Sequence, residues 1–291
     1  MCINHLIYGT RAVRKNFPVV LIAFIFKLSL SLLLLIPLQG ILSDVLSHRP
    51  AATSLLADWN LTPLIDLIFN NPDVLQCYGY VIIVGSIIIF TLHLFLSGGF
   101  YRTLTILSQE DSETFGIDRF FAWCGEYFHV FFKLTVLSII FYFAAAILSI
   151  ILSELGVHLF FGKSVSEPAR IFILLVHTAI LILLLLFVNM CMLYMKIIAV
   201  TSRSRSILSI VNEACLFLRK TIGKVIVLYA ILLFGLLVIT GTYCFAHFSI
   251  QRLPLWLSII ALFICQQVFS FARSWYRLIG YASHIHLYNA N

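Results

Sequence analysis

Charged residues are scarce in this sequence: Asp, Glu, Lys and Arg make up only 11% of its 291 residues, whereas hydrophobic residues make up 62%. Soluble domains carry about 25% charged residues, because their outer surface faces water. A globule of this length could not bury so large an apolar fraction and still present a polar exterior. The composition therefore excludes an ordinary soluble protein and predicts a protein that is surrounded by lipid.

Recognisable catalytic motifs are also missing, since the sequence contains no HExxH, GxSxG or GxGxxG pattern. Gly162-Lys163-Ser164 lacks the upstream glycine of a phosphate-binding loop. The one run of carboxylates, Glu110 to Glu113, is expected to be a solvated connector, with a metal or partner contact as the alternative. We therefore expect a protein that is not an enzyme and that holds no cofactor or metal ion.

The seven cysteines show no CxxC or Cys/His metal spacing. We expect free thiols, with a disulfide between Cys77 and Cys244 as the alternative, because both are predicted near the outer face. The net charge of +7 would suggest a nucleic-acid partner in a soluble protein. Here the basic residues lie between apolar stretches, so membrane topology and anionic lipid explain them better, and no nucleic-acid partner is expected.

Six stretches have the roughly 20 mainly apolar residues that a membrane-spanning helix needs. They are Phe17–Gln39, Tyr78–Leu104, Phe131–Leu155, Ile171–Val200, Ile222–Phe248 and Leu255–Tyr281. The first is longer than the apolar region of a signal peptide, and we expect it to stay in the mature protein. The predicted fold class is an all-α, polytopic membrane protein made of one membrane domain over residues 1–291.

The distribution of basic residues orients these six helices. One side carries 14 of them: Arg11, Arg14, Lys15, Arg102, Arg119, Lys133, Lys196, Arg203, Arg205, Arg219, Lys220, Lys224, Arg273 and Arg277. The other side carries four: Arg49, Lys163, Arg170 and Arg252. The positive-inside rule then places both termini in the cytoplasm. The long loop over 40–77 lies outside, and it contains a glycosylation sequon at Asn60 whose use the sequence does not decide.

Three cytoplasmic segments that precede odd-numbered spans have the spacing of amphipathic helices. Their apolar positions are Ile3, Leu6, Ile7 and Val13; Phe120, Phe121, Cys124, Tyr127, Phe128 and Phe131; and Ile207, Ile210, Val211, Ala214, Cys215 and Leu218. Basic and acidic residues occupy the opposite faces. Such helices lie in the headgroup region with the apolar face toward the acyl chains.

These segments also suggest an internal repeat. The second and third align without gaps at an offset of 91 residues, which places Cys124 on Cys215 and Lys133 on Lys224. The chain then divides into three copies of a surface helix, an outward span and a return span, at 1–105, 117–200 and 206–288. The return spans end alike at Tyr101-Arg102, Tyr194-Met195-Lys196 and Tyr276-Arg277. The alternative is convergence, because aromatic and basic residues gather at any cytoplasmic interface.

The stretch Gly98-Gly99-Phe100-Tyr101-Arg102, the acidic connector and the aromatic spacing from Phe120 to Lys133 resemble a group of bacterial six-helix membrane proteins. The group includes the membrane domain associated with glycerophosphoryl diester phosphodiesterases. The resemblance covers roughly 98–250 and implies six spans in a bacterial inner membrane. Catalysis in those phosphodiesterases belongs to a separate soluble domain, so the resemblance implies no activity for this chain.

Two sets of polar residues are candidate sites. Lys27, His93, Gln266 and Gln267 share one predicted depth near the membrane midplane and could form a polar cluster or line a pathway; interhelical hydrogen bonding is the alternative. Candidate contacts for anionic lipid or a partner are Arg14, Lys15, Arg102, Lys196, Arg203, Arg205, Arg219, Lys220, Lys224, Arg273 and Arg277. The expected function is therefore a membrane scaffold that binds anionic lipid headgroups or a membrane or cytoplasmic partner protein. The alternative is a transporter or channel that uses the midplane cluster.

Overall fold

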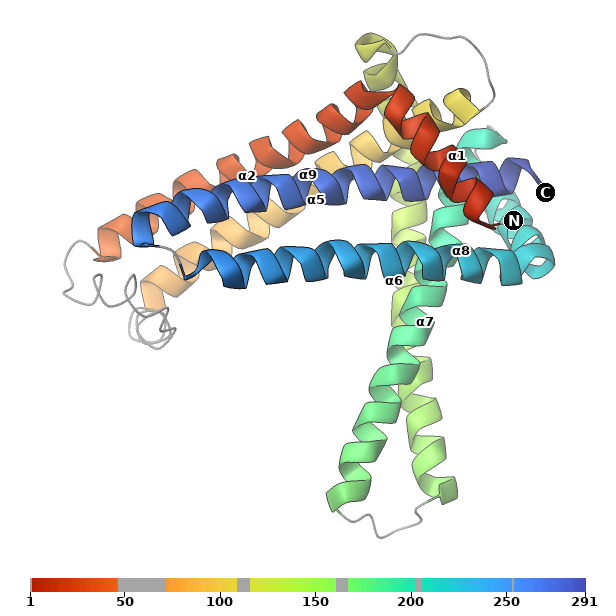
Figure 1. Ribbon diagram of the computed structural model, residues 1–291. Coiled ribbons are helices and arrows are strands. Elements are labelled where there is room, and N and C mark those ends of the chain that lie inside the picture. The colour runs from red at the N-terminus through yellow and green to blue at the C-terminus, as the bar shows by residue number, and fades with distance from the viewer. Residues whose placement is uncertain (1, 47–71, 109–115, 161–166, 203–205, 253) are drawn as a thin grey trace. The chain divides into compact units, whose positions relative to one another are not determined.

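The computed structural model describes residues 2–46, 72–108, 116–160, 167–202, 206–252 and 254–291. Over these ranges the chain forms helices and no strand (Figure 1). The helices are α1 (Cys2–Lys15), α2 (Phe17–Leu46), α5 (Pro72–Ser108), α6 (Ile117–Phe160), α7 (Glu167–Thr201), α8 (Ile207–Ile250) and α9 (Leu255–Asn289). The predicted all-α class is confirmed. Asn60, Glu110 to Glu113, Gly162 to Ser164, Arg203 and Arg205 lie outside the described residues.

Six helices in the described ranges are long and apolar enough to cross a membrane. Their apolar segments are Phe17–Pro37, Gly79–Ile106, Ile117–Gly156, Ile171–Thr201, Ile207–Ile250 and Trp256–Asn289, which confirms the six predicted spans. Large apolar side chains along them point outward: Ile36 is 71% exposed and Phe143 is 68% exposed. A soluble protein could not tolerate so many, whereas acyl chains are a suitable solvent for them. The chain is therefore an integral, multi-pass membrane protein.

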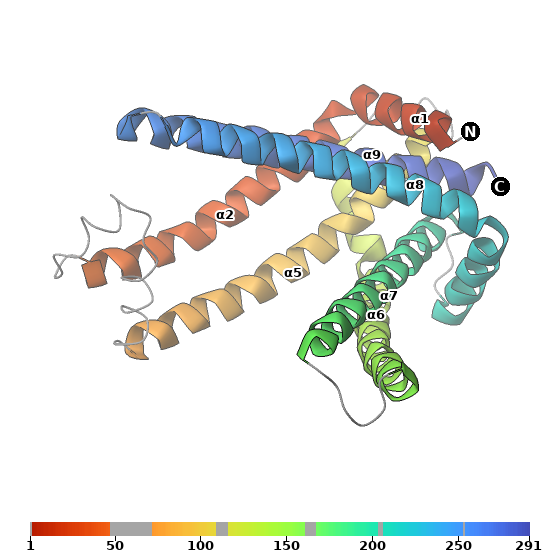
Figure 2. The ribbon, with the colours of Figure 1, turned by 60° about the horizontal axis from the view of Figure 1, so that its bottom comes forward.

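The chain divides into two compact units, Phe17–Leu94 and a larger unit made of Met1–Asn16 and Phe95–Asn291. The Phe17–Leu94 unit holds α2 and most of α5, and Leu34 of α2 fills the space beside Gly85 of α5. In the larger unit, α6 packs along α7 and α8 packs along α9. Figure 2 shows α1 running beside α9, and these two helices are in extensive contact.

The amphipathic segments join their spans in two ways. Asn16 interrupts the chain between α1 and α2, and its backbone N–H donates to the carbonyl of Val13 (3.1 Å). In α6 and α8 the amphipathic segment continues into the span without a break, which makes each helix 44 residues long. At about 1.5 Å per residue each extends far beyond the roughly 30 Å hydrocarbon core. Figure 2 shows that the first turns of α8 bend away from the direction of the rest of the helix.

Buried side chains of the larger unit gather where helix ends meet. The largest fully buried ones are Phe120, Phe131 and Leu134 of α6, Leu104 of α5, Tyr194, Ile197 and Ile198 of α7, Ile210 and Leu228 of α8, and His284, Ile285 and Leu287 of α9. We call this set the helix-end core. It combines the C-terminal ends of α5, α7 and α9 with the N-terminal parts of α6 and α8.

The same type of contact recurs around this core. Gly99 of α5 lies against Cys124 and Phe120 of α6, and Tyr194 of α7 lies against Phe217 of α8 with their ring centroids 5.0 Å apart. Gly9 of α1 lies against α9 in a corresponding way. Each return span therefore ends against an amphipathic segment.

Buried positions also recur between α1 and α8. His5, Gly9, Val13 and Asn16 are buried, and so are Ile210, Ala214, Leu218 and Thr221, each 205 residues later. Asn16 and Thr221 make the same local bond, donating from the side chain to the carbonyl oxygen four residues earlier (3.1 and 2.7 Å). The three-copy repeat stays a prediction, and this common pattern of burial agrees with the sequence alignment of Val13 with Leu218.

Candidate functional site

Tyr194 and His284 form the most deeply buried polar pair of the helix-end core. Tyr194 is fully buried and His284 is 2% exposed. A hydrogen bond of 2.8 Å joins the Tyr194 hydroxyl to Nδ1 of His284, and the two rings meet edge to face. Asn189 donates to the hydroxyl of Tyr229 (2.5 Å), whose ring lies 6.1 Å from that of His284. These polar groups join α7, α8 and α9, and the bond between buried partners fixes how α7 and α9 meet.

A second group combines aromatic rings with one guanidinium. Tyr101 of α5 is 2% exposed and stacks on Tyr281 of α9, with ring centroids 4.7 Å apart. Phe131 of α6 meets Tyr101 edge to face at 5.8 Å. Arg277 donates from Nε to the Tyr281 hydroxyl (2.6 Å), and its guanidinium lies 5.5 Å from the centre of the same ring. The tyrosine therefore orients the planar face of Arg277.

Lys196 of α7 adds a second positive charge beside Arg277. Its ammonium group lies 6.0 Å from the centre of the Phe131 ring, and its charge interacts unfavourably with that of Arg277. Lys196 is partly buried, whereas Arg277 is exposed. Arg102 of α5 donates from Nη1 to the carbonyl of Val200, one turn beyond Lys196, at 3.5 Å. Within the described ranges, none of these three cations forms a salt bridge with a carboxylate.

The α1–α9 contact brings two histidines together. Nδ1 of His5 lies 2.7 Å from Nδ1 of His286, and the ring of Tyr8 stacks on His286 with centroids 4.0 Å apart. A bond between two ring nitrogens requires one neutral, accepting nitrogen. From α8, Lys224 donates to Oδ1 of Asn291 (2.5 Å) and adds a positive charge near His5.

Burial, together with the positive charges of His286 and Lys224, holds the pKa of His5 below its usual value of 6.5. Protonation is therefore easier when α1 is detached, so acid favours detachment and the stabilisation from docking is lost as the pH falls below 6.5. We expect the melting temperature of wild type in detergent to fall between about pH 7.5 and about pH 5.5, and to fall less for His5→Gln. Equal decreases in the two proteins would contradict this origin of the pH dependence.

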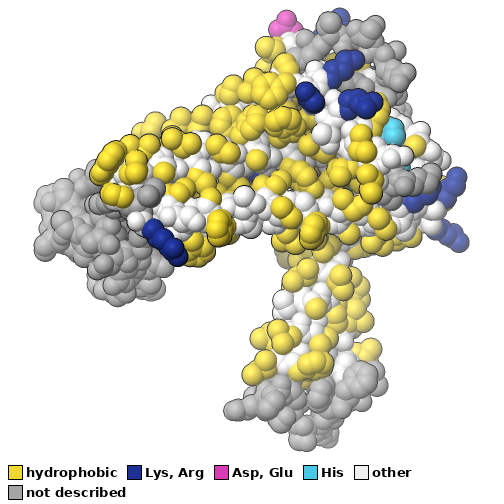
Figure 3. All heavy atoms as spheres, in the orientation of Figure 1, with side chains coloured by type: hydrophobic (Ala, Val, Ile, Leu, Met, Phe, Trp, Pro, Cys, Tyr) yellow, Lys and Arg dark blue, Asp and Glu magenta, His cyan; other side chains and the backbone are white. Residues whose placement is uncertain are grey.

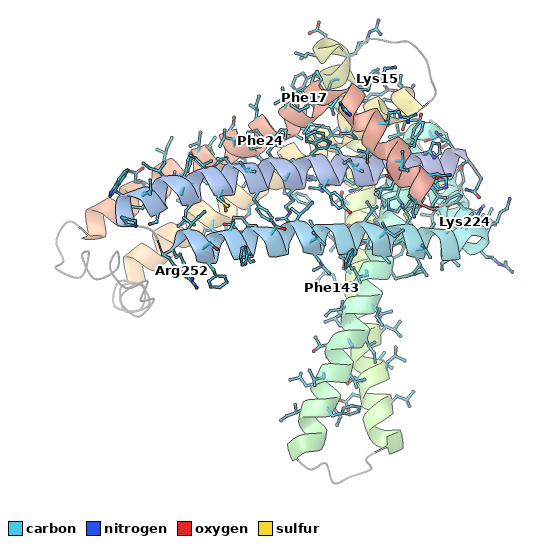
Figure 4. The ribbon with its side chains drawn as sticks, in the orientation of Figure 1. Lys15, Phe17, Phe24, Phe143, Lys224 and Arg252 are labelled. Carbon is cyan, nitrogen blue, oxygen red and sulfur yellow. The ribbon has the colours of Figure 1, made fainter. Side chains whose placement is uncertain are left out.

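The predicted basic contacts lie at the helix ends. Arg14, Lys15, Arg219, Lys220 and Lys224 are exposed on α1 and α8, and Arg273 is exposed on α9. Figure 3 shows Lys and Arg side chains gathered near α1 and the N-terminal end of α8, whereas hydrophobic side chains cover the lengths of the helices. In Figure 4, Lys224 and Arg252 mark opposite ends of the apolar part of α8.

The predicted midplane cluster divides between the two units. Lys27, which is partly buried, and the exposed His93 belong to Phe17–Leu94, and Gln266 and Gln267 belong to the larger unit. Gln266 accepts a hydrogen bond from the hydroxyl of Tyr243 of α8 (2.5 Å), which links α8 to α9. The cluster of four residues remains a prediction. The alternative disulfide is absent, because Cys244 is a free thiol.

The fold and this site define an all-α, multi-pass integral membrane protein whose polar side chains concentrate where helix ends pack together. No family model, no curated protein and no solved structure matches this chain.

Proposed function

We propose that this integral membrane protein is a scaffold without catalytic activity that binds anionic lipid headgroups at the basic ends of its helices. The observation that carries the proposal is the set of exposed cations on α1 and the N-terminal half of α8, namely Arg14, Lys15, Arg219, Lys220 and Lys224. We call this set the basic collar. It borders apolar helix surfaces such as those around Leu216 and Ile226, which are 60% and 53% exposed.

This pairing of charge and apolar surface is what a lipid interface requires. Exposed apolar side chains face the acyl chains, and lysine or arginine side chains reach the headgroup level. Each such cation near an anionic membrane surface contributes about 1 kcal/mol, and the attraction decreases as salt shortens the Debye length. The proposal places the basic collar and both termini on the cytoplasmic side, in agreement with the distribution of basic residues.

The test is the lipid shell that copurifies with the protein. We expect the double variant Arg219→Gln/Lys220→Gln to retain several-fold less anionic lipid than wild type at about 0.1 M salt, because about 2 kcal/mol of attraction is lost. Arg252→Gln is the control, since Arg252 is an exposed cation at the other end of α8. Mass spectrometry of the retained lipid measures the effect. Equal lipid content in the double variant and wild type would refute the proposal.

A further inference from the structure

Lys196 and Arg277 of the larger unit are two neighbouring cations that have no counter-ion in the described part of the chain. In the described part of the chain, the Lys196 ammonium makes no hydrogen bond, and its one ring contact is with Phe131. Phe131 meets the stacked Tyr101–Tyr281 pair, and Arg277 lies over Tyr281, so the same aromatic group carries both cations and their charges repel each other. A partly buried ammonium without an acceptor is unfavourable, and a second positive charge beside it adds to the penalty. An anion between the two cations would give the Lys196 ammonium an acceptor and would offset the repulsion between the two positive charges.

The remaining donors identify the type of anion. Arg277 uses Nε for Tyr281, and its two terminal nitrogens donate to no acceptor in the described part of the chain. Those terminal N–H groups form a planar fork that matches two oxygens of a phosphate. Lys196 supplies a further charged donor, and stacking over Tyr281 limits the movement of the fork. Arg277 is exposed, so the position between the cations can be reached from outside the protein.

We propose that Lys196 and Arg277 bind one phosphate group, which either a phospholipid headgroup or a free phosphate ion can supply. The site deepens the proposed function, on which it rests, by adding one defined position to the diffuse lipid shell of the basic collar. Binding at the phosphate site and binding at the basic collar differ in their response to salt. Exposed cations are screened when the Debye length falls from about 10 Å at 0.1 M to about 3 Å at 1 M, whereas an anion that also contacts the partly buried Lys196 is screened less.

The experiment uses the full chain in a neutral detergent at about 1 M salt, where binding to exposed cations is suppressed. One sample is titrated with phosphatidylglycerol in mixed micelles and another with inorganic phosphate, and the melting temperature and the number of retained lipids are measured. We expect saturable binding of one phosphate group per chain. Binding in the lipid sample alone assigns a headgroup, binding in both samples assigns phosphate from either source, and both results support the site.

Two variants test the residues. We expect Lys196→Met and Arg277→Gln each to weaken binding at high salt by about tenfold or more, because a charged hydrogen bond is lost. Without ligand, Lys196→Met should melt at the same temperature as wild type or higher, since it removes an unpaired, partly buried charge. Arg273→Gln, one turn earlier on α9, is the matched control and should bind as wild type does.

Saturable binding that is unchanged in both variants would overturn the site, and so would the absence of binding in both samples. Both proposals are supported if the Arg219→Gln/Lys220→Gln variant loses the salt-sensitive lipid shell but still binds phosphate fully at high salt. A wild-type chain with no salt-sensitive shell but with high-salt binding refutes the basic collar and leaves the phosphate site intact.

Discussion

Replacing Phe131 with alanine is expected to destabilise the protein by about 3–5 kcal/mol, the usual range for a fully buried phenylalanine. The side chain is completely buried in α6 and lies between Tyr101 and Tyr127, whose ring centroids are 5.8 and 6.4 Å from its own. It also lies beneath the Lys196 ammonium. Its removal opens a cavity at the point where α5, α6 and α7 meet, and rigid neighbouring rings cannot collapse into that space.

The matched control is Phe143→Ala, the same substitution three turns further along α6. Phe143 is 68% exposed and points away from the helix in Figure 4. In a membrane its ring exchanges contacts with acyl chains, so its loss should change stability by less than about 1 kcal/mol. Thermal unfolding of both variants in the same detergent measures the difference. A larger loss for Phe143→Ala than for Phe131→Ala would contradict the helix-end core.

The second large effect is expected at Gly9, where α1 crosses α9. A methyl group added there would lie 2.8 Å from the carbonyl oxygen of Ile279 and 3.0 Å from the backbone nitrogen of Ser283. Backbone atoms cannot rotate away as the end of a flexible side chain can, so α1 must move outward. We expect Gly9→Ala to destabilise the protein by about 1–3 kcal/mol through overpacking and to speed tryptic cleavage after Arg11 and Arg14.

Gly223 of α8 provides the control of opposite sign. A methyl group added at Gly223 would meet no atom within 4 Å. Because alanine is the better helix former by about 1 kcal/mol, Gly223→Ala should be neutral or stabilising. Melting temperature and the rate of tryptic cleavage measure both variants. If Gly9→Ala were as stable as Gly223→Ala, the close contact of α1 with α9 would not exist.

The spans and the amphipathic segments were predictable because each depends on local sequence. The run predicted at Ile171–Val200 corresponds to Ile171–Thr201 in the structure, since about 20 consecutive apolar residues have few other favourable environments. The helical spacing in α8 likewise predicted Ile210, Ala214 and Leu218, which are buried. In α1 the predicted face was only partly right, because Val13 is buried whereas Ile3 and Ile7 are 62% and 52% exposed. In these cases the solvent preference of individual side chains decides the structure.

The partners of the polar residues were not predictable, because they depend on packing between distant segments. His284 bonds to a tyrosine 90 residues earlier and His286 to a histidine 281 residues earlier, and no local pattern encodes either pairing. The sequence grouped Tyr276 with Tyr101 by position along the spans. In the structure Tyr101 stacks on Tyr281, whereas Tyr276 lies against Gly235 of α8. Tyr276 and Tyr281 are five residues apart on α9, which is more than one helical turn, and the sequence does not indicate which of the two contacts α5.

The contact of α1 with α9 also constrains how the chain is made. The ribosome synthesises α1 before any other described helix, and α9, its main packing partner, after all of them. Until α9 has been synthesised, the face of α1 that is finally buried, including His5 and Val13, is therefore not covered by α9. During this time an amphipathic helix can lie on the bilayer surface with its apolar side toward lipid. Docking of α1 onto α9 is then a late step in maturation, because it follows the synthesis of the other described helices.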